Sequence, residues 1–353
     1  MTTSSAKAAF VAAQSQLSSL LVTDRQREAV ADLLSRLPAV GGAQYLECRV
    51  GSREAQAVDF LVAITRLQRE DNATTQAGSL LAGSGFERLL PEWRQPGSLL
   101  NEVVPVAWLE FDDVERQRGL APSVCVSVVP SYIDMYAPLA SQAPAELIAS
   151  LHASILSIRG SAVDAEEQAT LERCATRMPP GAHWIHLSVM TARSPVALKL
   201  YGAFPEAQLT GYLDTIGWRG DLARVERVLA RYFPTSRTGG TLYVDLPASE
   251  LPRGDPGLGL CFSQQQVRAS NERDPSHREL LAAFVDDGLC LPEQARALAE
   301  WAGVQQVGDK RAKRLLDLKL VLRPKQSPLL KAYLGFSLVG RENGFSLGLS
   351  QHP

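Results

Sequence analysis

The spacing of apolar residues changes along the chain between a helical period of three to four residues and a strand period of two. Helical spacing predicts two opening helices over residues 10–21 and 24–37, with Thr23 or Asp24 as the N-cap of the second. Alternation then predicts five pairs of strands, at 45–50, 58–64, 103–111, 123–129, 183–190, 196–201, 241–246, 258–264, 316–322 and 331–339. Helical spacing returns between most of these pairs, at 86–93, 145–158, 165–177, 205–216, 221–233, 276–287 and 292–301.

Strands that arrive in pairs favour antiparallel sheets, whereas a parallel sheet needs single strands alternating with helices. We therefore expect an α+β protein of paired, mostly antiparallel strands with helices on one face, arranged as two similar halves. Pro179 and Pro180 cannot continue the helix before them and mark the expected boundary. The expected domains are residues 1–179, with two leading helices before the paired strands, and residues 180–353, a second α+β domain.

The composition is that of a globular protein, with 45% hydrophobic and 21% charged residues. A formal net charge of −2 provides no global field to attract nucleic acid or anionic membranes. No apolar run approaches the ~20 residues of a membrane helix, and the N-terminal stretch does not resemble a secretory signal. Five dispersed cysteines are typical of free thiols in a reducing compartment: Cys48, Cys125, Cys174, Cys261 and Cys290. We expect a cytoplasmic protein without nucleic-acid or membrane partners.

Two motifs have the residue types of a ligand site, but neither has the pattern that such a site needs. His183 and His186 are three residues apart on a predicted strand, so their side chains point to opposite faces and suit ordinary strand histidines better than one metal. The glycines of 335–348 lack the Lys-Ser/Thr of a phosphate loop, and 341–344 favours a hairpin turn instead. We therefore expect no metal and no cofactor.

Glu110 and Asp112 close a predicted strand and share one of its faces. Two carboxyls in this arrangement suit an acid/base pair. No phosphate-binding loop or histidine cluster accompanies them, so the pattern favours a solvated strand end that enters a charged loop, with a site for a cationic or N–H group as the main alternative. No catalytic residue is assigned from the sequence.

The strongest local charge lies between residues 310 and 331, where eight basic residues oppose only Asp317, giving +7. The basic residues are Lys310, Arg311, Lys313, Arg314, Lys319, Arg323, Lys325 and Lys331. This run is either a solvated face or a binding surface for an acidic peptide. Nucleic acid is disfavoured because aromatic residues for base stacking are not interleaved with the charges.

Several stretches have a distinctive order and texture: WLEFD (108–112), HLSVMTARSPVALKLYG (186–202), GYLDTIGWRGD (211–221) and the segments 280–301 and 317–336. In these stretches the chain resembles proteins encoded beside ribosomal peptide natural-product genes, specifically the precursor-peptide-binding proteins of crocagin-type biosynthesis. The resemblance covers roughly residues 100–340 and implies binding of a precursor peptide and its presentation to modifying enzymes of the pathway. It carries over no catalytic residues.

The main expectation is therefore a non-catalytic protein that adds a leader peptide to a sheet edge, with the strand pair 316–322 and 331–339 contributing. The candidate peptide-binding residues are Lys319, Arg323, Lys331, Tyr333, Trp108, Glu110 and Asp112. One alternative is an enzyme of the same pathway that cyclises or processes the peptide, using Glu110 or Asp112 as acid/base. Another is a structural or oligomer-forming scaffold, and a homodimer is left open.

Overall fold

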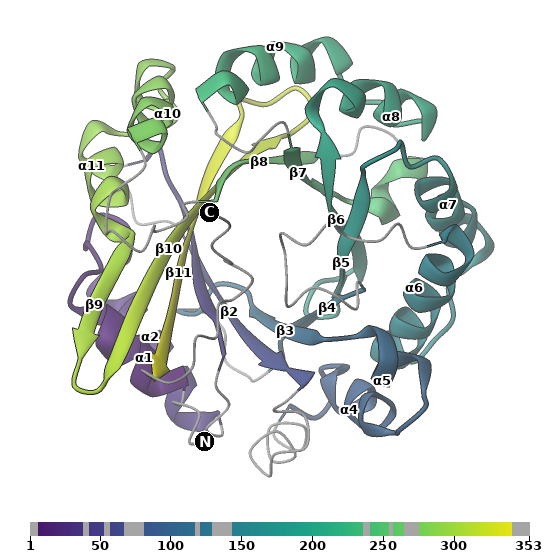
Figure 1. The fold of residues 1–353 in the computed structure, drawn as a ribbon, viewed down its shortest axis with the longest axis horizontal. Helices are drawn as coiled ribbons and strands as arrows, with labels where there is room; N and C mark the ends of the chain where they lie inside the picture. The colour runs from purple at the N-terminus through teal and green to yellow at the C-terminus, as the bar shows by residue number, and fades with distance from the viewer. Residues whose placement is uncertain are drawn as a thin grey trace.

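Ten antiparallel strands close into a barrel in the computed structural model, and helices surround it (Figure 1). The structure describes residues 6–37, 42–52, 57–66, 81–116, 121–128, 143–235, 241–253, 257–264 and 275–340. Within these residues, no helix is long and apolar enough to cross a membrane.

The strand order around the barrel follows the chain and closes where the last strand meets the first. The barrel strands are β1 (Gln44–Arg49), β2 (Val58–Thr65), β3 (Val106–Phe111), β4 (Ser123–Ser127), β5 (His183–Met190), β6 (Ala197–Pro205), β7 (Thr241–Leu246), β8 (Leu258–Gln264), β10 (Lys310–Leu322) and β11 (Leu329–Gly340). Closure comes from the antiparallel ladder of β11 on β1, which runs from Gln44↔Phe336 to Arg49↔Lys331. A further strand, β9 (Gly303–Val307), pairs with the first half of β10 outside this ring.

Helices cover the outside of the barrel (Figure 1). The α-helices of the described residues are α1 (Ala6–Gln14), α2 (Asp24–Arg36), α4 (Phe86–Arg94), α5 (Leu99–Val103), α6 (Pro144–Arg159), α7 (Ala165–Thr176), α8 (Leu209–Thr215), α9 (Leu222–Tyr232), α10 (Pro275–Asp286) and α11 (Pro292–Trp301). Local sequence sets several of their ends. Thr23 begins α2 and Asp164 begins α7 with a capping box, in which the cap side chain and the third helical residue exchange hydrogen bonds.

The main hydrophobic core lies between the barrel wall and these helices. Strand β3 shows how alternation builds it: Ala107, Leu109 and Phe111 belong to this core. Val106 and Trp108 point the other way and belong to a separate small cluster on the inner face. Because successive side chains of a strand alternate between faces, each barrel strand contributes one set of residues to the outer core and another to the interior.

The prediction of an α+β protein with antiparallel strands is confirmed, but the prediction of two similar halves is wrong. One barrel is formed in their place, because β4 and β5, which flank Pro179 and Pro180 in sequence, pair directly from Val124↔Val189 to Ser127↔His186. The two prolines end a helix on the outside of the barrel without interrupting the sheet. Paired strands are compatible with either arrangement, since the sequence pattern does not reveal which strand pairs join their neighbours.

Several elements differ from their predicted limits. The first helix, predicted over 10–21, is α1 at Ala6–Gln14. Val103 was predicted to begin a strand but ends helix α5, and β3 begins at Val106. Strand β10 begins at Lys310, six residues before the predicted 316, and β9 was not predicted. Strand β9 and the first residues of β10 are rich in polar and charged residues, so they lack the apolar alternation from which strands are predicted. The hairpin turn predicted at 341–344 lies outside the described residues.

Gly202 in β6 provides a test of how tightly the outer core packs on the barrel. A Cβ atom there would lie 2.6 Å from the backbone oxygen of His183 and 2.7 Å from a ring carbon of Trp184. We expect Gly202→Ala to destabilise the protein by about 1–3 kcal/mol in denaturant unfolding. Gly211→Ala is the matched control, since a Cβ on α8 would meet nothing within 4 Å and should be neutral or stabilising by up to about 1 kcal/mol. Equal effects of the two changes would contradict this account.

Candidate functional site

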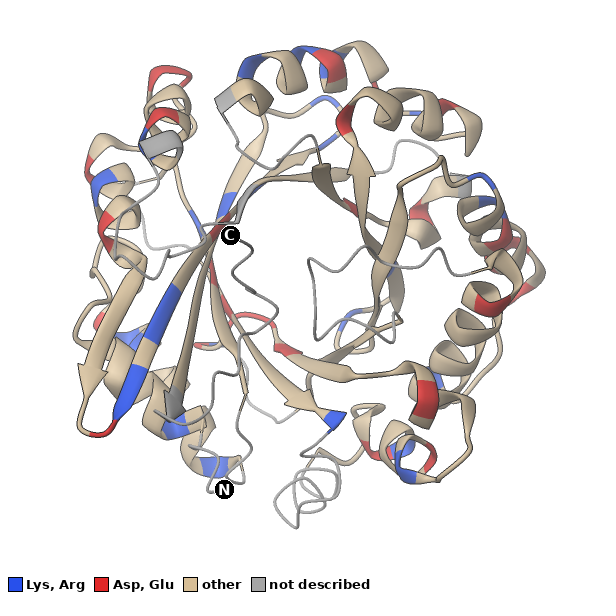
Figure 2. Cartoon of the chain, in the orientation of Figure 1, with Lys and Arg blue, Asp and Glu red and all other residues tan. Residues whose placement is uncertain are grey.

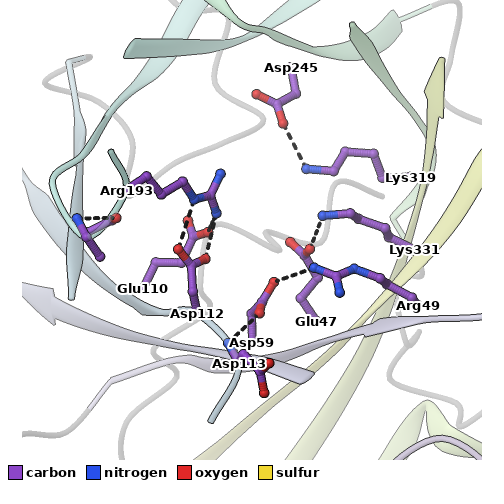
Figure 3. Close-up of polar contacts among 12 residues, drawn as sticks. Glu47, Arg49, Asp59, Glu110, Asp112, Asp113, Arg193, Asp245, Lys319 and Lys331 are labelled. Atoms are coloured by element: carbon purple, nitrogen blue, oxygen red, sulfur yellow. Dashed lines mark hydrogen bonds and ion pairs between the residues drawn. The ribbon is translucent and has the colours of Figure 1, made fainter. Parts of the chain in front are cut away.

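Charged side chains from most strands converge inside the barrel, where Figure 3 shows them pointing toward one another. Charged positions are thus not confined to the outer helices; Figure 2 also shows them on barrel strands. The residues of this set are Glu47 and Arg49 of β1, Asp59 of β2, Glu110 of β3, Lys199 of β6, Asp245 of β7, Asp317 and Lys319 of β10, Lys331 of β11, and Asp112 and Arg193 just beyond strand ends. We call this set the inner charge cluster.

Two lysines of the cluster stand directly opposite each other on β10 and β11, at Lys319↔Lys331. Lys319 Nζ donates to Asp245 Oδ2 at 2.9 Å, and Lys331 Nζ donates to Glu47 Oε1. Lys319 Nζ also lies 4.8 Å from the centre of the Tyr333 ring, a cation–π contact. Each lysine charge is therefore neutralised by a carboxylate from a different strand.

The lysine–carboxylate pairs hold their charges against the cost of burial. Burial disfavours the charged form of Asp245, but Lys319 outweighs it and lowers the pKa of Asp245 to about 2. Burial opposes the charge of Glu47 in the same way, and Lys331 brings its pKa well below the usual range. These pairs are ionised at neutral pH.

Gly259 lets Asp245 reach Lys319 across the intervening strand β8. Asp245 pairs with Gly259 in the β7–β8 ladder, and β8 in turn pairs with β10. A Cβ at position 259 would lie 2.9 Å from Asp245 Cβ and 3.0 Å from Lys319 Cδ. The missing side chain is what allows the two charged groups to approach over β8.

Arg193 is clamped between Glu110 and Asp112. Its Nε and Nη2 atoms donate to the two Asp112 oxygens at 2.8 and 2.6 Å, and Nη2 also donates to Glu110 Oε1 at 3.0 Å. This bidentate geometry is a strong form of ion pair. The two carboxyls differ in response: burial raises the pKa of Glu110, whereas for Asp112 burial is outweighed by Arg193 and the pKa is lowered.

Two further carboxyls in the cluster are easily protonated. Burial raises the pKa of Asp317 to about 7. Burial and the neighbouring Glu47 together raise the pKa of Asp59 to about 7. Asp59 has a structural contact as well, accepting the backbone N–H of Asp113 at 2.8 Å.

Lys199 is the one lysine of the inner charge cluster with no ion pair or hydrogen bond among the described residues. It is half-buried on β6, opposite Ser188 of β5. Its charge acts on Asp112 and Asp245 from a distance, after the larger effects of burial and of their direct partners. A half-buried lysine without a partner is suited to an anionic ligand.

Aromatic rings line two parts of the interior. His186, Tyr201 and Tyr243 form a stack, with ring centres 5.5 and 5.8 Å apart. Burial lowers the pKa of His186 to about 3, so this imidazole is neutral, with Nδ1 2.9 Å from the Ser127 hydroxyl. On the other side, Tyr45 and Trp108 are in contact, with ring centres 5.6 Å apart. The interior thus combines charged groups with flat apolar surfaces.

Six of the seven candidate residues from the sequence face the barrel interior: Lys319, Lys331, Tyr333, Trp108, Glu110 and Asp112. Arg323 is exposed after β10, where its backbone oxygen accepts from Arg224 Nη1 at 2.9 Å. The basic run therefore does not form one surface, because alternation along β10 sends its members to different sides. The strand pair expected to offer an edge is bonded on both sides, since β11 lies between β10 and β1.

Neither histidine of the 183/186 pair belongs to a group that could hold a metal ion, and the described residues contain no such group of three or more His, Cys, Asp or Glu side chains. The strand is also irregular between the two, with a register shift between Trp184 and His186. His186 takes its place in the ring stack of the interior. Sequence alternation alone did not locate that bulge.

A closed antiparallel barrel of ten strands inside a ring of helices, with charged and aromatic residues in its interior, defines the architectural class. No protein-family model and no curated protein matches the chain. Solved structures do match: the apo form of prenyltransferase PriB aligns with a TM-score of 0.56 and 14% identity over 96% of this chain and 98% of that chain. PriB in a ternary complex with L-tryptophan and dimethylallyl thiolodiphosphate gives the same TM-score and identity over 96% and 99%.

A second enzyme, NotF prenyltransferase, aligns with a TM-score of 0.53 and 14% identity over 93% of this chain and 91% of that chain. At this identity the likeness establishes a shared fold along nearly the whole length. It contradicts the expected non-catalytic peptide-binding protein, because these structural neighbours are enzymes that transfer prenyl groups. Nothing in them supports the resemblance to crocagin-type peptide-binding proteins.

Asp317 generates a prediction about pH. Its pKa in the folded protein is about 7, above the ordinary 3.8. The folded state therefore holds a proton that the unfolded state has lost, so this group stabilises the fold below about pH 4, and that contribution is lost as the pH rises through 7. We expect unfolding free energy to decline from pH 5 to 8 in the wild type and less steeply in Asp317→Asn. Asp214→Asn, on the exposed surface of α8, should retain the wild-type slope; identical slopes in all three proteins would exclude this role.

Proposed function

We propose that the protein is an aromatic prenyltransferase of natural-product biosynthesis, which transfers a prenyl group from an allylic diphosphate to an aromatic acceptor. The shared fold with PriB and NotF supports the reaction class. The observation that carries the proposal is Lys199, a partly buried cation inside the barrel without an ion-pair partner among the described residues. Lys319 and Lys331 face the same interior from β10 and β11.

The reaction needs an anion site beside an apolar surface. The bond between the allylic carbon and the diphosphate oxygen breaks, and its electron pair leaves with the diphosphate. The acceptor ring then forms a carbon–carbon bond to the allylic cation and afterwards releases a proton to a base. Preorganised positive charges stabilise the leaving group, and aromatic faces stabilise the cation while excluding water.

The lysines and rings of the β6–β11 side suit the donor. Lys199 and Tyr201 are adjacent inward positions on β6, and Tyr201 stacks on Tyr243 of β7 at an interplanar angle of 14°. Tyr333 lies beneath Lys319. A diphosphate held by the lysines would place its allylic chain against these three tyrosines.

The charge balance of the interior makes donor binding dependent on protons. Its cations are Arg49, Arg193, Lys199, Lys319 and Lys331, and its carboxyls are Glu47, Asp59, Glu110, Asp112, Asp245 and Asp317. Fully ionised, the set would be net negative and would repel a diphosphate. Asp59 and Asp317, each with a pKa near 7, can take up the protons that relieve this repulsion.

Glu110 is the carboxyl placed to receive the acceptor's proton. It is paired with Leu61 across the β2–β3 ladder and stands two residues from Trp108 on the same face of β3. Asp112, held by two hydrogen bonds from Arg193, stays ionised and fixes that arginine. Glu110 and Asp112, which the sequence presents as a pair, thus have different roles in this proposal: Glu110 accepts the proton and Asp112 positions Arg193.

The decisive experiment incubates purified protein with dimethylallyl diphosphate and a panel of indoles and phenols, with mass spectrometry of the products. A mass gain of one dimethylallyl group on an acceptor, together with release of diphosphate, is the expected result. Absence of transfer across the panel, with donor binding also absent by calorimetry, would falsify the proposal.

Lys199→Gln should weaken dimethylallyl diphosphate binding about 10- to 100-fold, because a charge-assisted contact to the diphosphate is lost. Lys199→Arg should restore part of the affinity. Lys7→Gln, at an exposed position of α1, is the control and should bind like the wild type. Calorimetric titration measures all four proteins, and equal affinity of Lys199→Gln and wild type would remove Lys199 from the donor site.

Glu110→Gln should lower kcat by about 10²-fold or more while leaving donor affinity within a few-fold, since a general base is lost without a diphosphate contact. Asp113→Asn is the matched control: Asp113 pairs with Arg116 at 3.4 Å, and asparagine tolerates its φ of 45°. Steady-state kinetics across pH 5–9 measures the change. A kcat for Glu110→Gln near that of the wild type would assign proton removal to another group.

A further inference from the structure

The five tryptophans of the chain differ in what their indole N–H groups contact. Three donate to backbone oxygens: Trp93 to Val104, Trp184 to Cys174 and Trp301 to Leu315. The indole N–H groups of Trp108 and Trp218 are buried and have no hydrogen-bond partner in the described part of the chain. A buried donor without a partner is costly, so each of these two requires an explanation.

Trp108 and Trp218 lie on opposite sides of the barrel wall. Trp218 belongs to the outer core between barrel and helices. Trp108 faces the interior from β3, paired with Ala63 on one side and Cys125 on the other, and only 7% of it is exposed. Its unpartnered N–H is therefore inside the barrel, in the space where a substrate would bind.

The surroundings of Trp108 are apolar and flat. The residues that pack with it on the inner face of β1–β4 are Tyr45, Leu61, Ala63, Val106 and Cys125, with Ala43 just before β1. The Tyr45 ring lies 5.6 Å from the Trp108 ring, centre to centre, at 55°. We call these residues the β1–β4 apolar patch.

The β1–β4 apolar patch and the lysines assigned to the donor occupy different positions on the inner wall of the barrel. Lys199, Lys319 and Lys331 come from β6, β10 and β11, whereas the patch comes from the first four strands. Glu110 follows Trp108 by two positions on the inner face of β3, so the proposed proton acceptor stands at the border of the patch. An aromatic ring on the patch would therefore have the carboxyl of Glu110 at its border, on the side where the charged residues of the interior begin.

We propose that the β1–β4 apolar patch binds the ring of the aromatic acceptor, and that Trp108 Nε1–H donates a hydrogen bond to a carbonyl or hydroxyl oxygen on the acceptor's substituent. This inference rests on the proposed prenyl transfer. Bound acceptor satisfies the donor that is otherwise left unpaired inside the barrel. A site built around such a donor rejects analogues that lack the matching oxygen, because the N–H then stays buried and unsatisfied.

The test compares two acceptors of similar shape, indole-3-acetamide and 3-isobutylindole, which differ in the side-chain carbonyl and amide. Binding is measured by calorimetry and transfer from dimethylallyl diphosphate by product mass. The wild type should favour indole-3-acetamide about 10- to 100-fold in affinity, and Trp108→Phe should reduce that preference to a few-fold. Trp218→Phe removes the other unpartnered indole N–H and should retain the wild-type preference.

Thermal unfolding of each variant shows whether the barrel is intact. If Trp108→Phe does not fold, β-(3-benzothienyl)alanine at position 108 keeps the bicyclic shape, replaces the N–H with sulfur and should lose the same preference. Transfer with an unchanged preference in the 108 variants overturns the inference while the proposed function stands. If affinity changes as expected but neither acceptor is prenylated, the binding site stands and the reaction fails. Failure of the wild type to bind either compound overturns the inference.

Discussion

Closure of the sheet between β1 and β11 is the constraint on which the rest of the structure depends. These strands are nearly the whole chain apart in sequence, and their ladder gives every barrel strand two bonded neighbours. Closure also separates an inner face of the sheet from an outer face. A charged side chain buried on the inner face is tolerated only where a side chain of opposite charge from another strand lies beside it. The Lys331–Glu47 contact crosses this same seam, so the ion pairs of the interior and the closure of the fold support each other.

Much of the secondary structure could be predicted from local patterns, and the topology could not. Capped helices such as α2 and strands with strong alternation such as β7 and β8 fall where the sequence places them. Strand pairs, however, look the same whether they end in separate sheets or continue into one another. Strands β4 and β5 pair although the two prolines lie between them in sequence, and no local pattern near Pro179 predicts this long-range pairing.

Only parts of the candidate site could be predicted from the sequence, again because the sequence does not show which strands lie side by side. Glu110 and Asp112 were recognised as sharing a face, yet their partner Arg193 lies about eighty residues on and had no signal of its own. The basic run of residues 310–331 looks like one surface in the sequence because a count of charges ignores the alternation of side chains along a strand. The ion pair between Lys319 and Asp245 depends on the pairing of β8 with β10, which the sequence does not show. Isolated charges in otherwise apolar strands, such as Lys199 and Asp245, were the overlooked signal, since a lone charge on the inner face of a closed barrel needs a partner or a ligand.

Carboxylates paired with lysines are an unexpected setting for a site proposed to hold a diphosphate, and their geometry explains how both demands can be met. Without an anion, unpaired lysines at Lys319 and Lys331 would face each other across adjacent strands and repel. Asp245 and Glu47 remove that repulsion through their ion pairs with the two lysines. A bound diphosphate could take over the same role, provided that nearby carboxyls accept protons, and Asp59 stands beside Glu47 in the β1–β2 ladder with a pKa near 7. In the proposed prenyltransferase, the paired lysines would thus stabilise the barrel, while Lys199, which has no ion-pair partner among the described residues, would make the first contact with the diphosphate.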